Sequence, residues 1–144
     1  MFSNVPKYSE EMVKPMREEL TALGVQELRN AKEVQQAIAG DEGTALLIIN
    51  SVCGCAAGNA RPAVRLALQN EVLPQRVVTV FAGVDTEAVA EARNHISGYP
   101  PSSPSMALFK GKRLVFMLPR HRIEGRSPEE IAADLKNAFA THCS

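Results

Sequence analysis

Residues Thr44 to Asn50 read Thr-Ala-Leu-Leu-Ile-Ile-Asn, a continuous apolar run of strand length without a polar face. This pattern is typical of a central strand that other elements cover on both sides. The stretch from Arg76 to Ala82, with Val-Val-Thr-Val-Phe at its centre, has the same character. We therefore predict two buried strands in the sheet of an α/β protein.

Two helices are expected before the first of these strands. Ser9 caps a helix that Gly24 ends, and Asn30 with Glu33 forms a capping-box pattern for a second helix that runs to Gly40. The expected apolar positions of the first helix are Met12, Met16, Leu20 and Leu23. A short strand over residues 25–28 joins the two helices.

Three further helices are expected, one between the two buried strands and two after the second strand. Apolar spacing predicts one from about Cys55 to Asn70, kinked at Pro62, and Asp85 is the expected cap of the next, which includes Ile96. The expected buried face of the first of these is Ala57, Ala60, Val64, Ala67 and Leu68. Ser127 opens the last helix as part of a capping box with proline at its first position.

A hairpin completes the expected sheet. Met106 to Phe109 and Arg113 to Leu118 flank Lys110-Gly111-Lys112, and a loop rich in proline and serine over Ser97–Ser105 precedes them. The order is helix, β-α-β-α-β-α, hairpin, helix. It predicts a sheet that is part parallel and part antiparallel, between helical layers.

Composition limits the class of protein. The 144 residues, 45% hydrophobic and 22% charged, suit one globular domain, expected over residues 1–144. Lysine plus arginine equals aspartate plus glutamate at 16 each, so no overall positive charge attracts nucleic acid or anionic lipid. The longest apolar run, Ala45 to Ile49, is far too short to span a membrane, and the N-terminal residues lack a secretory signal. We expect a cytoplasmic protein without nucleic-acid or membrane partners.

Two cysteines, Cys53 and Cys55, stand one residue apart where the first buried strand gives way to a helix. Reactive groups of α/β proteins gather at the carboxyl ends of strands, and the first turn of a helix favours a thiolate over a thiol. Gly54 leaves room for the backbone to curl into a small, easily reduced disulfide. We predict a labile redox pair in which Cys53 is more acidic than a free cysteine and Cys55 is less reactive.

Two other interpretations of the pair remain open. Free cysteines are often small apolar fillers of a core, although this turn is a poor place for one. Thiolates also bind zinc or an iron-sulfur cluster, and His142 and Cys143 would complete a four-ligand set with Cys53 and Cys55. Against the metal site, the usual two-residue spacing within cysteine pairs is missing.

Other polar residues give weaker signals. Pro104, just before a strand, is either an ordinary loop residue or a cis proline that exposes backbone groups to an extended chain. The basic cluster Arg120–Arg122 is either a solvated loop or a contact for an anionic thiol. Arg61 and Arg65 lie one helical turn apart beyond the thiols, and they either raise the local electrostatic potential or, as is usual for a helix surface, are surface charges without a role. Cys143 is either a mobile auxiliary thiol or without function.

Four segments of the chain resemble the bacilliredoxin family: residues Asn50 to Pro62 with their Cys-Gly-Cys, Pro101 to Leu108, Pro119 to Gly125, and His142-Cys143. The resemblance implies the thioredoxin-like fold, an α/β fold whose mixed central sheet is flanked by helices, with an extra N-terminal helix. It also implies a cytoplasmic thiol-disulfide oxidoreductase that removes bacillithiol, or a similar low-molecular-weight thiol, from mixed disulfides on proteins. Disulfide isomerase activity is the alternative within the same family.

The resemblance also assigns roles by position. Cys53 is the attacking thiol, Cys55 the resolving thiol, and Pro104 the cis proline that faces them. Gly54 and Ser103 belong to the expected binding surface. The implied partners are bacillithiolated or disulfide-containing client proteins, with bacillithiol as the thiol co-substrate and no tightly bound cofactor.

Overall fold

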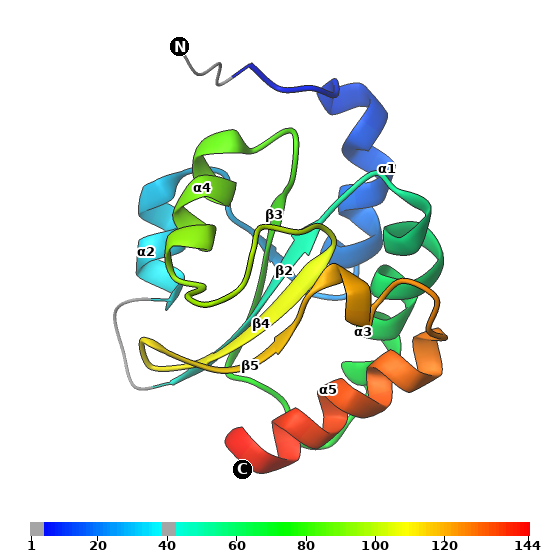
Figure 1. The fold of residues 1–144 in the computed structure, drawn as a ribbon, viewed down its shortest axis with the longest axis vertical. Coiled ribbons are helices and arrows are strands. Elements are labelled where there is room, and N and C mark those ends of the chain that lie inside the picture. The colour runs from blue at the N-terminus through cyan, green and yellow to red at the C-terminus, as the bar shows by residue number, and fades with distance from the viewer. Residues whose placement is uncertain (1–4, 39–42) are drawn as a thin grey trace.

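A twisted sheet with helices on both faces forms the molecule in the computed structural model, which describes residues 5–38 and 43–144 (Figure 1). The strand order is β1-β3-β2-β4-β5. The strands are β1 (Gln26–Glu27), β2 (Thr44–Asn50), β3 (Arg76–Phe81), β4 (Ser105–Lys110) and β5 (Arg113–Leu118). β1, β3 and β2 run parallel, whereas β4 and β5 are antiparallel to their neighbours. The expected mixed sheet is confirmed, with β2 at its centre.

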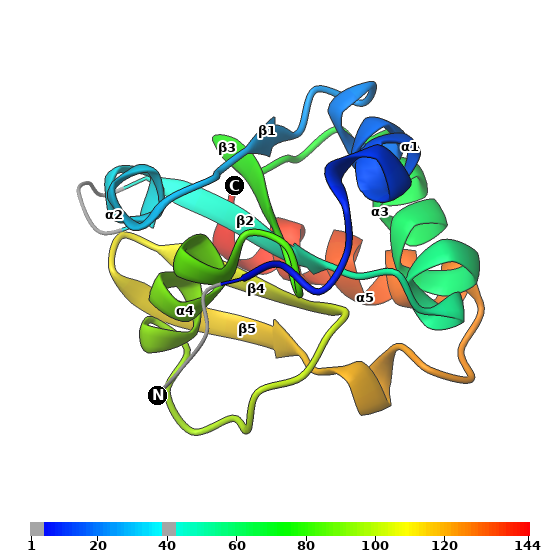
Figure 2. The ribbon, with the colours of Figure 1, turned by 90° about the horizontal axis from the view of Figure 1, so that it is seen from above.

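Two helical layers cover the sheet. The helices are α1 (Glu10–Thr21), α2 (Ala31–Ile38), α3 (Arg61–Ala67), α4 (Thr86–Asn94) and α5 (Pro128–His142). Figure 2 shows α2 and α4 on one face and α1, α3 and α5 on the other. None of the helices in the described ranges is long and apolar enough to cross a membrane.

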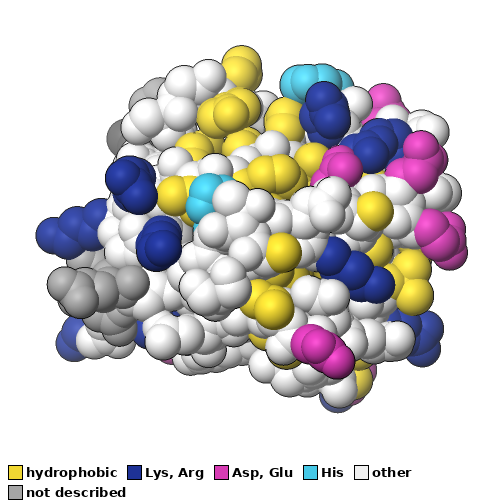
Figure 3. All heavy atoms as spheres, turned by 90° about the horizontal axis from the view of Figure 1, so that it is seen from below, with side chains coloured by type: hydrophobic (Ala, Val, Ile, Leu, Met, Phe, Trp, Pro, Cys, Tyr) yellow, Lys and Arg dark blue, Asp and Glu magenta, His cyan; other side chains and the backbone are white. Residues whose placement is uncertain are grey.

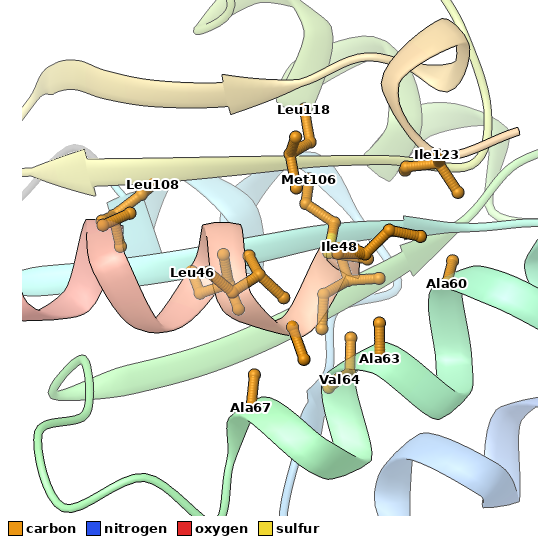
Figure 4. Close-up of a cluster of buried hydrophobic side chains, with 14 of the residues drawn as sticks. Leu46, Ile48, Ala60, Ala63, Val64, Ala67, Met106, Leu108, Leu118 and Ile123 are labelled. Atoms are coloured by element: carbon orange, nitrogen blue, oxygen red, sulfur yellow. The ribbon is translucent and has the colours of Figure 1, made fainter. Parts of the chain in front are cut away.

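Side chains of β2 alternate between two buried cores. Leu46 and Ile48 enter the core beneath α3 and α5, and Leu47 and Ile49 enter the core beneath α2 and α4. In Figure 4, Leu46 and Ile48 lie opposite Val64 of α3. Each buried leucine or isoleucine contributes about 1.5–3 kcal/mol of hydrophobic stabilisation. Because all seven residues of β2 are buried, the strand end that carries the cysteines is firmly held.

The predicted capping box is complete at α5 and only half formed at α2. At α5 the Ser127 hydroxyl accepts the Glu130 N–H at 3.1 Å, and the Glu130 carboxylate accepts the Ser127 N–H at 3.0 Å. At α2 the Asn30 side chain accepts the Glu33 N–H, but the Glu33 carboxylate accepts the N–H of Arg29 instead of that of Asn30. The capping box expected at Asn30 is therefore only half formed. The predicted end of this helix at Gly40 lies outside the described residues.

Asp85 precedes α4 as expected, but its side chain makes no cap hydrogen bond. Its carboxylate instead accepts hydrogen bonds from Arg17 at 2.8 and 2.9 Å and from the Phe81 N–H at 3.1 Å. The buried face of α1 also differs from the expected one, because the ion pair with Asp85 buries Arg17. Met12, which was expected in that face, is 48% exposed. A buried guanidinium requires an acidic partner, and this pairing outweighs simple apolar spacing.

The helix expected from Cys55 begins with a π-helical turn, η1 (Ala56–Ala60), before α3. This turn takes more residues than an α-helical turn and so shifts the phase of the buried face. Ala56 is buried and Ala57 is exposed, so the prediction of Ala57 as a core residue is wrong. Ala60, Val64 and Ala67 are buried as expected.

Candidate active site

Cys53 and Cys55 lie together in the turn between β2 and η1. Their Sγ atoms are 2.8 Å apart, both side chains are partly buried, and both thiols are free. The Ser51 hydroxyl donates to the Cys53 Sγ at 3.2 Å and accepts the Cys53 N–H at 3.2 Å. The Cys53 sulfur thus has two side-chain hydrogen-bonding neighbours, one thiol and one hydroxyl.

A buried set of hydrogen bonds around Arg61 holds the cysteine turn against the end of β2. Arg61 donates to the Asn50 side chain at 3.0 Å and to the Ser51 carbonyl at 2.9 Å. The Asn50 side chain also accepts the Ser51 N–H at 2.8 Å, and Glu19 of α1 lies 3.1 Å from the Arg61 Nε. Arg61 is only 3% exposed, so the interpretation that it is a surface charge is wrong. Its position is fixed by partners that come before the cysteines in the chain.

The electrostatics of the turn favour a thiolate at Cys53. Burial opposes ionisation, but hydrogen bonds from Cys55, from Ser51 and from the backbone N–H groups of Ala56 and Cys55 outweigh it and lower the pKa of Cys53. This direction agrees with the expected acidity of Cys53. The thiol of Cys55 is the natural donor to that thiolate.

Cys55 is shifted in the opposite direction. Burial raises the pKa of Cys55, and the adjacent Cys53 raises it further, through their shared hydrogen bond and through its negative charge. Arg120 lowers and Glu124 raises it by smaller amounts. The segment from Ser51 to Val64 contains no acidic residue, and the one carboxylate named here comes from Glu124, because the chain returns to the turn some seventy residues later.

The loop before β4 borders the thiols from the other side. The antiparallel register pairs Ile49 of β2 with Ser105, which places the residues just before Ser105 at the end of β2 from which the cysteines follow. The peptide bond between Ser103 and Pro104 is cis, as the second interpretation of Pro104 required. Arg120 donates to the Ser103 carbonyl at 3.3 Å and pairs with Glu124 at 3.0 Å.

The basic cluster is divided between two places. Arg120 faces the loop of Ser103, and its pKa is raised first by the hydrogen bond to Glu124 and then by the charges of the two thiols. His121 and Arg122 line a separate hollow of about 530 Å³ between β5 and α5. This side of the molecule, seen in Figure 3, carries apolar side chains among charged ones and histidine. Within the cluster, Arg120 is the residue whose charge lowers the pKa of Cys55.

Gly54 is exposed and does not adopt a positive φ. A Cβ atom added to it would meet nothing within 4 Å. With both thiols free, the turn therefore makes no steric demand for glycine at this position. That Gly54 lets the backbone curl into a disulfide stays a prediction for the oxidised form.

Cys143 lies far from the cysteine pair. Burial raises its pKa, while a hydrogen bond with Thr44 lowers it by less. Thr44 and Asn50 are the two ends of β2, on the order of 20 Å apart for a seven-residue strand. The four-ligand metal set of Cys53, Cys55, His142 and Cys143 is therefore wrong, because the strand holds its two halves at opposite ends.

From the sequence, Ser51 was missed as a contributor to the site, and the roles of Arg61 and Arg120 were left open. Ser51 had a local signal, since a serine two residues before a buried N–H often accepts it through its hydroxyl. The roles of Arg61 and Arg120 depend on contacts with Asn50 and Ser103, which only the fold brings near.

The opposite shifts of the two thiols lead to a first prediction. In alkylation rates measured against pH, with each cysteine resolved by peptide mass spectrometry, the midpoint for Cys53 will be below that of Cys55. Removal of the hydroxyl in Ser51→Ala will raise the midpoint of Cys53, because its thiolate loses a donor. Ser97→Ala, at an exposed loop position, is the control and will leave it unchanged. Equal midpoints for the two cysteines contradict the assignment of Cys53 as the ionised partner.

Comparisons with known proteins match nearly the whole chain. Residues 8–143 match the model of a family described as disulphide isomerase. A bacilliredoxin of Halalkalibacterium halodurans is 52% identical over 136 residues, which cover 94% of each chain. A bacilliredoxin of Shouchella clausii is 53% identical over 137 residues, or 95% of this chain and 94% of its own.

Solved structures show the same fold at low sequence identity. The thioredoxin of Malassezia sympodialis has a TM-score of 0.56 at 15% identity and aligns over 99% of this chain and 98% of its own. Oxidised thioredoxin O1 from Arabidopsis thaliana has a TM-score of 0.52 at 15% identity, over 83% of this chain and 98% of its own. The expected thioredoxin-like fold is thereby confirmed.

Proposed function

The chain belongs to the bacilliredoxin family and is a thiol-disulfide oxidoreductase, and from that premise we propose that it removes bacillithiol from mixed disulfides on client proteins. The observation that carries the proposal is the pair of oppositely shifted thiols, 2.8 Å apart, at the end of β2. A thiolate is the nucleophile in disulfide exchange, so Cys53 is the attacking residue.

The exchange conserves electrons at each step. The Cys53 thiolate attacks the bacillithiol sulfur of the mixed disulfide, forms a Cys53–bacillithiol disulfide, and releases the client cysteine as a thiolate that takes a proton from solvent. The Cys55 thiol has not reacted at this point. Its raised pKa keeps it protonated until the negative charge on Cys53 has been consumed.

Two routes return the enzyme to its starting state. In the first, Cys55 loses its proton and attacks the Cys53 sulfur, which releases bacillithiol as a thiolate and leaves a Cys53–Cys55 disulfide for an external dithiol to reduce. In the second, a free bacillithiol thiolate attacks the adduct, and the products are bacillithiol disulfide and the Cys53 thiolate. The 2.8 Å between the two sulfurs favours the first route.

The residues around the pair are proposed as a binding surface. Ser103 and Pro104 offer backbone groups to an extended client, and Gly54 leaves the approach to the sulfurs without a side chain. Bacillithiol acts as a co-substrate, no cofactor is tightly bound, and the cytoplasm supplies the reducing conditions that keep the thiols free.

Disulfide isomerisation is the second candidate, and the description of the matched family favours it. It uses the same attack by Cys53, but on a protein disulfide, so that the enzyme is held to the client until another client thiol displaces it. The two functions differ in the group that Cys53 carries in the intermediate.

A substrate comparison tests the proposal. One client protein is prepared as the bacillithiol or the glutathione mixed disulfide, and the release of its thiol is measured with free bacillithiol as reductant. We expect the bacillithiolated client to react at least about tenfold faster, which corresponds to about 1.4 kcal/mol of selectivity. Scrambled ribonuclease serves as the isomerase substrate in parallel. Equal rates on both mixed disulfides contradict the preference for bacillithiol, and faster repair of the scrambled protein favours isomerisation.

A further inference from the structure

A small hollow of about 200 Å³ lies beside the cysteine turn. Six of the residues that line it are Lys7, Tyr8, Ser51, Val52, Arg93 and Ser103. They come from the N-terminal segment, from the residues just before Cys53, from α4 and from the loop of the cis bond. The volume suits a fragment of a small molecule and is too small for a folded partner.

Arg93 is the unusual member of this lining. Its Nε atom is fully buried without a hydrogen-bond partner, and within residues 5–38 and 43–144 no carboxylate pairs with its guanidinium. Burial lowers the pKa of Arg93, and no charge from the described part of the chain offsets that effect. The buried Nε of the guanidinium loses hydration without compensation while Arg93 as a whole is partly exposed, so an anion that entered the hollow would gain a charge-assisted interaction with it.

The N-terminal segment closes one side of the hollow and brings a second cation. The Lys7 N–H donates to the Gly83 carbonyl at 2.7 Å, and Gly83 has a φ of +83°. A Cβ at Gly83 would lie 2.9 Å from the Tyr8 ring, so the glycine permits this close packing. Two cationic residues, Lys7 and Arg93, therefore line the hollow, and none of the described residues that line it is acidic.

The hollow is linked to the reacting sulfur through Ser51. Ser51, part of its lining, donates to the Cys53 Sγ at 3.2 Å, and Ser103 precedes the cis bond. A small thiol joined to Cys53 through a disulfide therefore has a polar, positively charged recess within reach of its remaining atoms.

We propose that this hollow binds a carboxylate of the low-molecular-weight thiol that Cys53 removes, with Arg93 as the principal contact and Lys7 as the second. The inference rests on the proposed function and names the class of thiol: a small thiol that bears a carboxylate. During the exchange the carboxylate pairs with the guanidinium while the Cys53 thiolate attacks the sulfur of the same molecule. Arg93 is thus a specificity-determining residue.

The test varies the charge of the small thiol on one client peptide. The probes are mixed disulfides with 3-mercaptopropionate, 2-mercaptoethanol and cysteamine, which carry a negative, a neutral and a positive group. We expect Arg93→Gln to slow client release from the 3-mercaptopropionate disulfide about tenfold and to change the rate with the neutral probe less than about twofold. Rates are compared between proteins for the same probe, so that the intrinsic reactivity of each disulfide cancels.

Three further variants sharpen the result. Arg93→Lys will retain part of the preference for the anionic probe, and Lys7→Gln, at an exposed position, will lose a smaller part without a risk to folding. Lys32→Gln removes one positive charge from an exposed position of α2, the helix that packs against α4, and will leave the ratio of anionic to neutral rates unchanged. A second series of client peptides carries the neutral probe and has either glutamate or glutamine next to the modified client cysteine. It tests whether Arg93 binds a carboxylate of the client instead of one on the small thiol.

Each outcome either supports or overturns the proposal that the hollow binds a carboxylate of the small thiol. Loss of the anionic preference in Arg93→Gln, with the neutral rate retained, supports the proposal. An unchanged preference in Arg93→Gln overturns it, as does an Arg93 effect confined to the client glutamate. If the wild-type protein releases client from none of the three probes, the proposed function fails as well, and the two failures are therefore distinguishable.

Discussion

Replacement of Cys53 by alanine is expected to slow the release of bacillithiolated client at least about 1000-fold, because the variant lacks the nucleophile. Cys55→Ala, by contrast, will still attack and will accumulate as a stable Cys53–bacillithiol adduct. Its turnover will depend on free bacillithiol, since only the external thiol can then remove the adduct. The two cysteines thus differ in kind, although they lie one residue apart.

Intact-protein mass spectrometry after brief incubation with a bacillithiolated client measures this difference. One bacillithiol per molecule is expected on Cys55→Ala and none on Cys53→Ala. Cys143→Ala is the control, because Cys143 lies at the other end of β2, and it will behave as the unaltered protein. An adduct on Cys55 in the Cys53→Ala variant would reverse the assigned roles.

The largest effect on stability is expected at Arg17. Its guanidinium is 2.8 Å from Asp85 and from Glu10, and it lies 5.4 Å from the centre of the Phe81 ring. Arg17→Met keeps most of the side-chain volume but leaves the buried carboxylate of Asp85 without its cation. The free energy of unfolding will fall by about 3–5 kcal/mol, which is a large part of the total for a domain of this size.

Arg29 provides a matched control for this measurement. It pairs with Glu10 and Glu27, which also lie within 4 Å of Arg17, but its side chain is 48% exposed. Arg29→Met will therefore cost no more than about 1 kcal/mol. Urea unfolding of both variants, followed by circular dichroism, gives the comparison. A loss of similar size in the two variants would mean that burial of the Arg17 pair adds nothing.

The elements that could be predicted are those whose signals are local. β2 and β3 are unbroken apolar runs, the hairpin of β4 and β5 is marked by Lys110-Gly111-Lys112, and α5 begins at a complete capping box. The cysteine pair was equally accessible, because two thiols at the junction of strand and helix are a chemical signal in themselves. Here local preference and the overall fold agree.

What could not be predicted depends on residues far apart in the chain. Arg17 and Asp85 are 68 positions apart, so neither the burial of the one nor the missing cap bond of the other has a local signal. Glu124 and Arg120 approach the thiols for the same reason. The exposure of Ala57 arises from the π-helical turn, which no spacing based on a regular α-helix anticipates.

The remote position of Cys143 turns it into an internal standard for redox measurements. Its thiol lies beside Thr44, outside the exchange chemistry proposed for Cys53 and Cys55, and burial raises its pKa. The labelling of Cys143 in any sample therefore reports the amount of protein and the efficiency of the reagent, independently of the oxidation state of the pair. The ratio of label on Cys53 to label on Cys143 then measures oxidation of the site in mixtures where protein concentration is unknown, including whole-cell extracts.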